Sequence, residues 1–442
     1  MRVTLSVVAV SLALIACSEP GEPPEPVASV EVAPASDTIA VGQPQQFSAR
    51  LSDTRGHTLT GRAVFWVSSD PDIASVSSTG MVTGVDNGNV TIMATSEGIQ
   101  GSAAVLVQRP FIATAATLWA GHACALDQAG AAFCWGFNWR GVLGTGYFGE
   151  EYLTPARVAG GHSFTTITTW DHTCALAASG QAYCWGDNSY GKLGDGTTID
   201  RLAPVAVAGG LTFADISAGG AATCGIVAGT AHCWGAGWLL PVGPSVSFAS
   251  IALGDSYGCG VTNARLGYCW GSNFNGQLGD GTTELRSVPT PVSGGLSFAS
   301  LVTGFRHSCG ITTTGVTYCW GDNEAGQVGD NSVIERLVPT AVAGSHTMTA
   351  ISAGWAHTCG VTDDGAGFCW GSNWDGALGD GTTTDRLTPT PVAGGHTFVR
   401  IEAGAWQSCG IRTDGSLLCW GTPPVGDGTM LARSVPTLVL ME

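Results

Sequence analysis

The sequence predicts an all-β chain in which a β-sandwich precedes a series of repeated β-hairpins. A hairpin with two cysteines recurs along residues 109–442, and an alternating pattern without cysteine occupies residues 28–108. Charged residues make up only 12% of the chain, and 65 of its residues are glycine. This composition is typical of short strands joined by tight turns. No stretch has the apolar period of an amphipathic helix.

The hairpin at residues 357–371 shows the repeated unit most clearly. Two short apolar runs flank the turn residues Asp363, Asp364 and Gly365. Cys359 and Cys369 are ten positions apart with the turn midway, so an antiparallel register places them opposite each other within disulfide range. We therefore expect a disulfide across the hairpin.

The same unit occurs seven times, with the first cysteines 50 residues apart except for one step of 35. The expected disulfides join Cys124 to Cys134, Cys174 to Cys184, Cys224 to Cys233, Cys259 to Cys269, Cys309 to Cys319, Cys359 to Cys369 and Cys409 to Cys419. Such a period indicates a repeat architecture. Paired cysteines favour an oxidising compartment; free thiols or a metal site are the alternative, which the absence of a C-x-x-C motif disfavours.

The N-terminal residues predict export. Residues 1–16 hold one charge, Arg2, and a short apolar run typical of a signal peptide. Leu14-Ile15-Ala16-Cys17 resembles a bacterial lipobox, which implies lipidation of Cys17 and an outer-membrane or cell-surface lipoprotein; a plain secretory signal is the alternative. The lipid would be the only contact with a membrane. Residues 17–27 are rich in Pro and Glu, and we expect an extended tether.

Residues 28–108 predict an antiparallel β-sandwich, because alternating apolar runs are separated by turn clusters. The segments Trp66–Asp70, Gly80–Gly84 and Gly88–Ile92 closely resemble the group 2 bacterial Ig-like domain, which implies an N-terminal Ig-like β-sandwich. That family occurs on extracellular and cell-surface proteins. We expect Trp66 to be a core residue and no catalytic residue in this domain.

Residues 338–371 predict the four strands of one propeller blade, at 338–343, 348–353, 357–362 and 366–371. The repeat region begins at 111–117, which matches the second of these strands, and ends at 435–440, which matches the first. We therefore expect strand closure, in which the last segment completes the blade begun by the first.

Three long connections carry Gly-x-Leu-Gly-Asp-Gly-Thr-Thr, at 191–198, 276–283 and 376–383. Together with Cys-Trp-Gly-x-Asn and Ala-Gly-x-x-His-Thr-Cys, they resemble the repeats of the regulator-of-chromosome-condensation family across about residues 111–440. The resemblance implies a seven-bladed β-propeller for residues 109–442. The sequence departs from the pattern between Cys233 and Cys259, where the long Gly-Asp-Gly loop is missing.

Three recurring polar positions invite a functional interpretation. The Asp-Gly loops contain Asp195, Asp280, Asp330, Asp380 and Asp427, but one carboxylate per loop is too few for Ca²⁺, and Asx-turns explain them. The arginines that follow these loops are expected to pair with them. The histidines two residues before several first cysteines are expected to form structural hydrogen bonds. We predict no catalytic residue, metal or cofactor.

Two groups of aromatic residues differ in regularity. A Trp follows every second cysteine, which predicts packing between blades. The other group is irregular and should crowd one end of the hairpins, where exposed aromatic side chains are typical of interfaces. The predicted binding face consists of Trp119, Trp170, Phe305, Trp355 and Trp406 near the first cysteines, and of Trp139, Tyr190, Phe274 and Trp374 after the second cysteines.

These features predict a surface-anchored, monomeric binding or adhesion module for a protein or glycan rather than an enzyme. A net charge of −17 without Lys/Arg clusters argues against nucleic acid. Nuclear members of the resembled family are exchange factors for a small GTPase, a partner that an exported chain would not meet. Secreted propellers of similar repeat type inhibit β-lactamases, so an enzyme inhibitor is the first alternative. A carbohydrate-active or other surface enzyme is the second.

Overall fold

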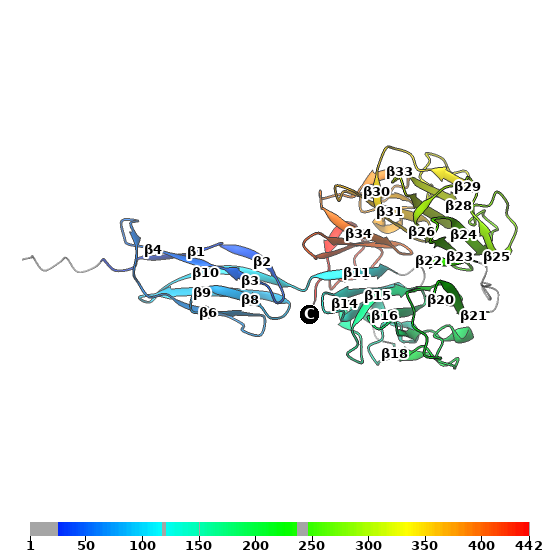
Figure 1. Ribbon diagram of the computed structural model, residues 1–442. Coiled ribbons are helices and arrows are strands. Elements are labelled where there is room, and N and C mark those ends of the chain that lie inside the picture. Colours follow the sequence, from blue (N-terminus) through cyan, green and yellow to red (C-terminus); the bar gives the residue numbers. More distant parts are fainter. Residues whose placement is uncertain (1–24, 117–120, 150, 237–245, 442) are drawn as a thin grey trace, which may run out of the picture. The chain divides into compact units, whose positions relative to one another are not determined.

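The computed structural model (Figure 1) describes residues 25–116, 121–149, 151–236 and 246–441. The chain forms two compact units. One consists of residues up to 85 together with 89–107, and the other of residues 86–88 and those from 108 onward. The predicted signal peptide, Cys17 and most of the predicted tether lie outside the described residues.

The first unit is an all-β domain of three sheets. The sheets are β1 (Ser29–Ala33), β4 (Ser48–Ser52) and β5 (Thr58–Leu59); β2 (Ser36–Ala40), β10 (Ile99–Gln108), β9 (Gly88–Ser96) and β6 (Phe65–Ser68); and β3 (Pro44–Gln46), β8 (Met81–Gly84) and β7 (Ala74–Val76). Phe47 and Ile92 are fully buried at the centre of its core. Trp66 is only partly buried and packs against that core from its edge.

The second unit contains seven sheets in chain order among the described residues. The first three are β11 (Phe111–Ala116), β12 (His122–Asp127), β13 (Ala132–Phe137), β14 (Glu151–Arg157); β15 (Phe164–Thr169), β16 (His172–Ala177), β17 (Ala182–Gly186), β18 (Arg201–Ala206); and β19 (Asp215–Ala218), β20 (Ala222–Val227), β21 (Thr230–Gly235). The fourth and fifth are β22 (Phe248–Leu253), β23 (Tyr257–Thr262), β24 (Gly267–Gly271), β25 (Arg286–Pro291); and β26 (Phe298–Thr303), β27 (His307–Thr312), β28 (Thr317–Gly321), β29 (Arg336–Ala341). The last two are β30 (Met348–Ala353), β31 (His357–Thr362), β32 (Gly367–Gly371), β33 (Arg386–Pro391); and β34 (Phe398–Ala403), β35 (Gln407–Arg412), β36 (Leu417–Gly421), β37 (Arg433–Leu438).

The second and third strands of each sheet in this unit form the predicted cysteine hairpin. The two cysteines lie directly opposite each other in the register, as they do in β31 and β32. All seven predicted disulfides are present, which confirms the pairing expected from the spacing. They join Cys124 to Cys134, Cys174 to Cys184, Cys224 to Cys233, Cys259 to Cys269, Cys309 to Cys319, Cys359 to Cys369 and Cys409 to Cys419.

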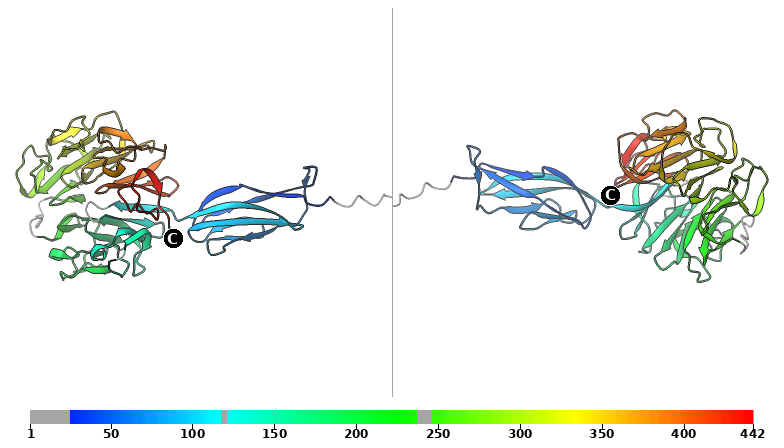
Figure 2. Two further views of the ribbon diagram at one scale, coloured as in Figure 1. Left: turned by 180° about the vertical axis from the view of Figure 1, so that it is seen from behind. Right: turned by 45° about the horizontal axis from the view of Figure 1, so that its top comes forward.

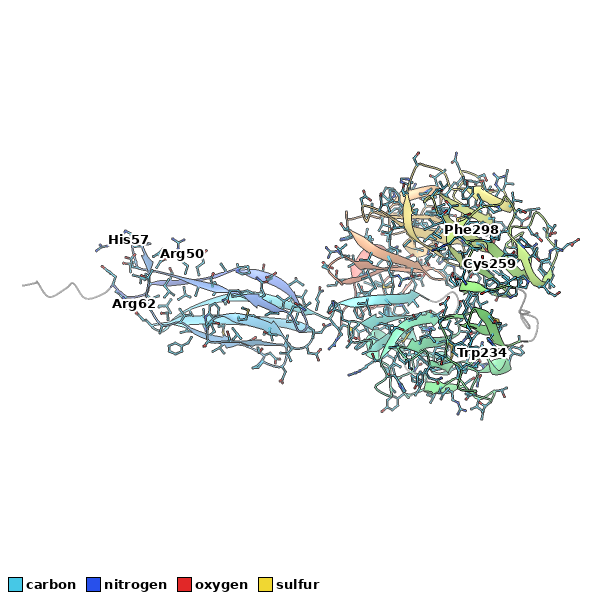
Figure 3. All side chains as sticks on the ribbon, in the orientation of Figure 1. Arg50, His57, Arg62, Trp234, Cys259 and Phe298 are labelled. Atoms are coloured by element: carbon cyan, nitrogen blue, oxygen red, sulfur yellow. A yellow bond between two sulfur atoms is a disulfide. The ribbon has the colours of Figure 1, made fainter. Side chains whose placement is uncertain are left out.

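The disulfides lie in the cores between sheets. Both cysteines of each pair are fully buried except in the third sheet, where Cys233 is partly buried. Cys259 and Phe298, both labelled in Figure 3, belong to one buried cluster between the fourth and fifth sheets. Each bridge therefore contributes apolar surface to packing as well as closing its hairpin.

The predicted assignment of strands to sheets is wrong by one strand. β29, expected to begin the sheet of 348–371, instead pairs with β28 as the outermost strand of the preceding sheet. Likewise β37 pairs with β36, and β11 begins a sheet of its own. The predicted strand closure is therefore not found. The reason lies in the loop after the third strand of each sheet. An ion pair in this loop, such as Arg433–Asp427, holds the chain so that the next strand pairs with the third strand.

The junctions between sheets repeat the same contacts. The Trp that follows each second cysteine packs against the preceding sheet, as predicted. The indole N–H of Trp320 donates to the Gln277 carbonyl at 2.9 Å, and that of Trp420 donates to the Ala377 carbonyl at 2.9 Å. Six of these tryptophans are buried, and Trp234 is partly buried.

The first and last sheets meet through the contacts seen at the other junctions (Figures 1 and 2). Trp135 of the first sheet packs with Ile411 and Leu417 of the seventh. The backbone N–H of Phe111 donates to the Gly415 carbonyl at 2.8 Å, as the N–H of Phe398 donates to that of Gly365 at 2.8 Å between the sixth and seventh sheets. The segments that begin and end the repeat region are thereby side by side.

A central cavity of about 250 Å³ is lined by the first strand of every sheet. Apart from Trp170, its lining is mostly small and polar or aliphatic, with Thr114, Thr168, Ser217 and Ser352 as examples. One ion pair, Arg400–Glu402 with 3.1 Å between Nε and Oε1, also lines it. The sheets are thus arranged around a narrow axis that their inner strands nearly fill.

The outermost strand of each four-stranded sheet in the propeller unit contains a proline. These residues are Pro155, Pro204, Pro289, Pro339, Pro389 and Pro436. Because proline has no N–H to donate, it is tolerated in sheets mainly on edge strands. Its presence in all six marks these strands as edges.

Candidate binding face of the propeller

Where the loops lie among the described residues, a sheet places two loops at the same end of its cysteine hairpin. In the sixth sheet the short loop is a tight turn, because the N–H of Gly354 donates to the His357 carbonyl at 2.8 Å. The long loop begins with a 3₁₀ turn, η4 (Trp374–Gly376), in which Asp375 has a φ of 52°. His357 lies opposite Gly371 in the register, so Trp355 and Trp374 emerge at the same end of the sheet.

Three aromatic residues of the short loops form a stack that crosses the last three sheets. The ring centroids of Phe305 and Trp355 are 4.6 Å apart, and those of Trp355 and Trp406 are 4.9 Å apart with 22° between their planes. The guanidinium of Arg306 lies 4.9 Å from the Phe305 centroid, at cation–π distance. These three residues belong to the predicted group near the first cysteines, called here the inner set. The predicted group after the second cysteines is called the outer set.

Trp170 does not have the exposure that the prediction requires. Its side chain is only 3% exposed and packs with Ala218 and Phe305. A buried indole cannot contact a partner without leaving its packing site, so we correct its role to that of a packing residue. Trp119, also predicted on this face, lies outside the described residues.

A second cavity, of about 520 Å³, brings the two aromatic sets together. Trp406 of the inner set and Trp139 of the outer set both line it, with Phe137 and Pro423 as further apolar walls. Its polar lining includes Arg140, Asp171, Asp187, Gln407 and Thr422. This size and mixture are typical of small-molecule and side-chain binding pockets.

The rest of the outer set is exposed at separate positions of the face. Tyr190, Phe274 and Trp374 are all largely exposed, as Trp139 is. Trp139 and Trp374 occupy equivalent 3₁₀ turns, η1 (Trp139–Gly141) and η4, and have almost equal exposures of 68% and 67%. Of the two, Trp139 lines the cavity of about 520 Å³.

A buried charged network borders this cavity. The Lys192 ammonium, 2% exposed, lies 2.6 Å from carboxylate oxygens of both Asp171 and Asp187. Arg140 lies 2.6 Å from Asp187, and Nδ1 of His172 lies 3.0 Å from Asp171. Sequence reasoning missed this network. Its only signal was Lys192 at a position where other repeats have Val142, Gln277 or Ala377.

The network keeps the carboxyl group of Asp187 ionised. Burial alone would raise the pKa of Asp187, but hydrogen bonds from Lys192 and Ser189 bring this pKa well below its usual range. Burial lowers the pKa of His172, although its contact with Asp171 opposes this. Asp187 is therefore a carboxylate already engaged by cations.

The Asp-Gly loops use their carboxylates within the loop, as predicted. Oδ1 of Asp380 accepts hydrogen bonds from the backbone N–H and hydroxyl of Thr382, and Oδ2 accepts one from Arg386 at 2.8 Å. Burial would raise the pKa of Asp380, but these hydrogen bonds lower it. The same pairing recurs for Asp195, Asp280, Asp330 and Asp427.

The recurring histidines bridge neighbouring sheets through hydrogen bonds, which confirms their structural role. Nε2 of His357 lies 3.0 Å from the Ser408 hydroxyl, and that hydroxyl donates to the Ala377 carbonyl at 2.9 Å. The hydroxyl has one proton to give, so Nε2 must carry the proton of the shared hydrogen bond. Burial lowers the pKa of His357 to about 4, and the side chain is neutral at pH 7.

Among the described residues, no cluster of three or more His, Cys, Asp or Glu side chains is placed to hold a metal ion. The same part of the chain contains no helix with the length and apolar character needed to cross a membrane.

Two kinds of family model match the chain. The bacterial Ig-like domain (group 2) matches residues 26–107. The regulator of chromosome condensation (RCC1) repeat matches residues 179–226, 268–311, 314–361 and 364–411, and a second RCC1 repeat model matches 298–327 and 348–376. The chain therefore contains an Ig-like domain of this group followed by RCC1 repeats. No curated protein matches it in sequence.

Solved structures resemble the repeat region. Human WBSCR16 has 18% sequence identity and a TM-score of 0.64, with 70% of this chain and 94% of that chain covered. This likeness identifies the fold as a β-propeller. Yeast RCC1 (Prp20), solved bound to Kap60, has 20% identity and a TM-score of 0.47, with 74% of each chain covered. The ectodomain of the Physcomitrella patens receptor kinase CR4 has 24% identity and a TM-score of 0.49, with 71% of this chain and 74% of that chain covered.

Proposed function

We propose that the protein is a binding module that uses the aromatic loop face of its propeller to hold a macromolecular partner. The observation that carries this proposal is the cavity where Trp139 and Trp406 meet. Exposed aromatic side chains around a concave site are typical anchors of binding interfaces. Asp171 and Asp187, the carboxylates at the cavity, are engaged by Lys192, which supports binding rather than acid–base catalysis.

A comparison of variants tests this function. The immobilised protein captures partners from the secreted and surface fractions of its source. Trp139→Ala and Trp406→Ala should reduce capture of the same partner at least about tenfold, as for hot-spot residues. Asp364→Ala, in the turn at the opposite end of the hairpin, is the control. Loss of capture in Asp364→Ala with full capture by both tryptophan variants would contradict the proposal.

We further propose that the sheets close into a ring of seven blades, without a shared strand. The bond from the Phe111 N–H to Gly415 and the bond from Gln407 Nε2 to the His122 carbonyl at 3.3 Å support closure. Hydrogen exchange tests it: peptides covering 111–116 should exchange as slowly as those covering 398–403. Exchange of 111–116 at the rate of an exposed loop would contradict closure.

The location of the protein is the third part of the proposal. Seven disulfides indicate an oxidising, extracellular-type environment. We propose that Cys17 carries a lipid that anchors the exported protein at a membrane surface. Cys17→Ser should move the protein from the membrane fraction to the soluble fraction, and unchanged membrane association would refute the anchor.

A further inference from the structure

We propose that the cavity of about 520 Å³ beside Trp139 and Trp406 is a subsite for one uncharged sugar ring of a glycan. The inference rests on the binding function proposed above and names the chemical class of its ligand. Three observations carry it: an unpaired acceptor oxygen at the cavity, an unpaired donor, and two indole rings in the wall between them.

The acceptor is the side-chain oxygen of Gln407. Its Nε2 donates to the His122 carbonyl at 3.3 Å, which fixes the orientation of the amide because two oxygens would repel each other there. Oε1 then has no hydrogen-bond partner among the described residues, although Gln407 lines the cavity and is only 5% exposed. Because Gln407 lines the cavity, a ligand hydroxyl placed there can donate a hydrogen bond to this oxygen.

The donor is the guanidinium of Arg140. Its Nη1 is held by Asp187 at 2.6 Å and by the Ser189 hydroxyl at 3.0 Å. Nε and Nη2 have no partner in the part of the chain that the structure describes, and the side chain is 55% exposed. Arg140 is thus oriented by its ion pair while two of its nitrogens remain available to a ligand oxygen.

The walls are the rings of Trp139 and Trp406. Trp139 stands in a 3₁₀ turn, and Trp406 is braced by its stack on Trp355. Both indoles offer large apolar faces, and the stack lowers the conformational entropy that Trp406 loses on binding. A pyranose has an apolar face of C–H groups and a rim of hydroxyls, so it covers an indole while its hydroxyls reach Gln407 and Arg140.

Other ligand classes fit the lining less well. An anion would approach Asp171 and Asp187, and a cation would approach Arg140. A purely apolar group would leave Oε1 of Gln407 without a partner. An uncharged ligand with both hydroxyl donors and acceptors around an apolar face satisfies every one of these groups.

The test uses the full-length exported protein and a panel of methyl glycosides of glucose, galactose, mannose and N-acetylglucosamine, followed by calorimetry and ligand-observed NMR. At least one should bind with a Kd of about 1 mM, as expected for so small a ligand. Trp139→Ala should weaken binding about tenfold or more, whereas Trp139→Phe should retain most of it. Phe65→Ala, which removes an aromatic side chain of the first unit with the same exposure of 68% as Trp139, should change nothing.

Three results would overturn the inference. They are no binding of any glycoside to the wild type, equal weakening by Phe65→Ala and Trp139→Ala, and tighter binding of arginine methyl ester or glucuronate than of the neutral sugars. If the glycosides fail while Trp139→Ala still abolishes capture of a protein partner, the saccharide subsite is wrong and the binding function stands. If neither glycoside binding nor partner capture depends on Trp139 and Trp406, both are wrong.

Discussion

The junctions between the sheets and the loop face of the propeller follow opposite rules. At the junctions one residue type recurs, as Trp320 and Trp420 show by donating the same indole hydrogen bond at 2.9 Å. On the loop face the residue changes from sheet to sheet, with Phe305, Trp355 and Asp255 at equivalent positions. The buried indole recurs because its packing site between two sheets recurs, whereas a surface position is free to specialise.

The largest expected effect comes from removing a tryptophan that is buried at a junction. Trp320→Ala removes a fully buried indole between two sheets, and we expect a loss of about 3–5 kcal/mol in the free energy of unfolding. Trp374→Ala, on the exposed face, should stay within about 0.5 kcal/mol. Urea denaturation measures both, and similar losses for the two variants would break the distinction between junction and face.

The disulfides, like the junction tryptophans, recur in every sheet of the propeller. Replacing both Cys359 and Cys369 by Ala opens a short loop of separation 10, and chain entropy gives an upper estimate of about 2–3 kcal/mol. The thermal midpoint of this double variant should fall, while binding at the loop face should be unchanged. Loss of partner capture in a folded double variant would show that the hairpin also shapes the face.

The Asp-Gly loops provide the next test of this comparison. Asp380→Asn replaces a carboxylate oxygen facing Arg386 by an amide, and we expect a loss of about 1–2 kcal/mol because a nearly buried charge-assisted hydrogen bond is broken. Stability of Asp380→Ala should fall at least as far. If both variants match the wild type, the loop pairs are surface ion pairs of little weight.

The smallest expected effect concerns pH. Burial lowers the pKa of His307 to about 3, while the unfolded chain has the ordinary value of about 6.5. Acid therefore protonates the unfolded state first, and the stability that this site contributes above pH 6.5 is lost progressively as the pH falls toward 3.

His307→Gln removes this titration, and Gln407 shows that Gln fits the equivalent position of the seventh sheet. The stability gap between wild type and His307→Gln should shrink by about 1 kcal/mol between about pH 7 and about pH 5.5. Urea midpoints at the two pH values test this. A gap that is equal at both would show that His307 is protonated in the folded protein or solvent-accessible.

The sequence predicted the parts of the fold that local geometry dictates. The turn midway between Cys359 and Cys369 sets their register, and the periodic Trp positions indicate inter-sheet packing. It could not tell which sheet takes the strand 336–341, because that strand follows one long loop and precedes one short turn. The Asp330–Arg336 ion pair and the hydrogen bonds from Asn323 Nδ2 to the Ser332 and Ile334 carbonyls hold this loop beside the preceding sheet.

The candidate site was harder to predict for the same reason. Burial of Trp170 depends on Ala218 and Phe305, which come from other sheets. The cavity at Trp139 and Trp406 joins the first and last sheets, so no local pattern indicates it. The Lys192 network depends on three side chains whose approach follows from the fold.

The proline in the outermost strand of each four-stranded sheet has a consequence for a chain built from copies of one hairpin. Copies of one hairpin, within a chain or in crowded neighbouring chains, can exchange strands or add to one another's rims. A residue that cannot donate a hydrogen bond makes each rim a poor template. Because Pro339 and Pro389 repeat with the sheet itself, each four-stranded sheet among the described residues carries its own protection against aggregation.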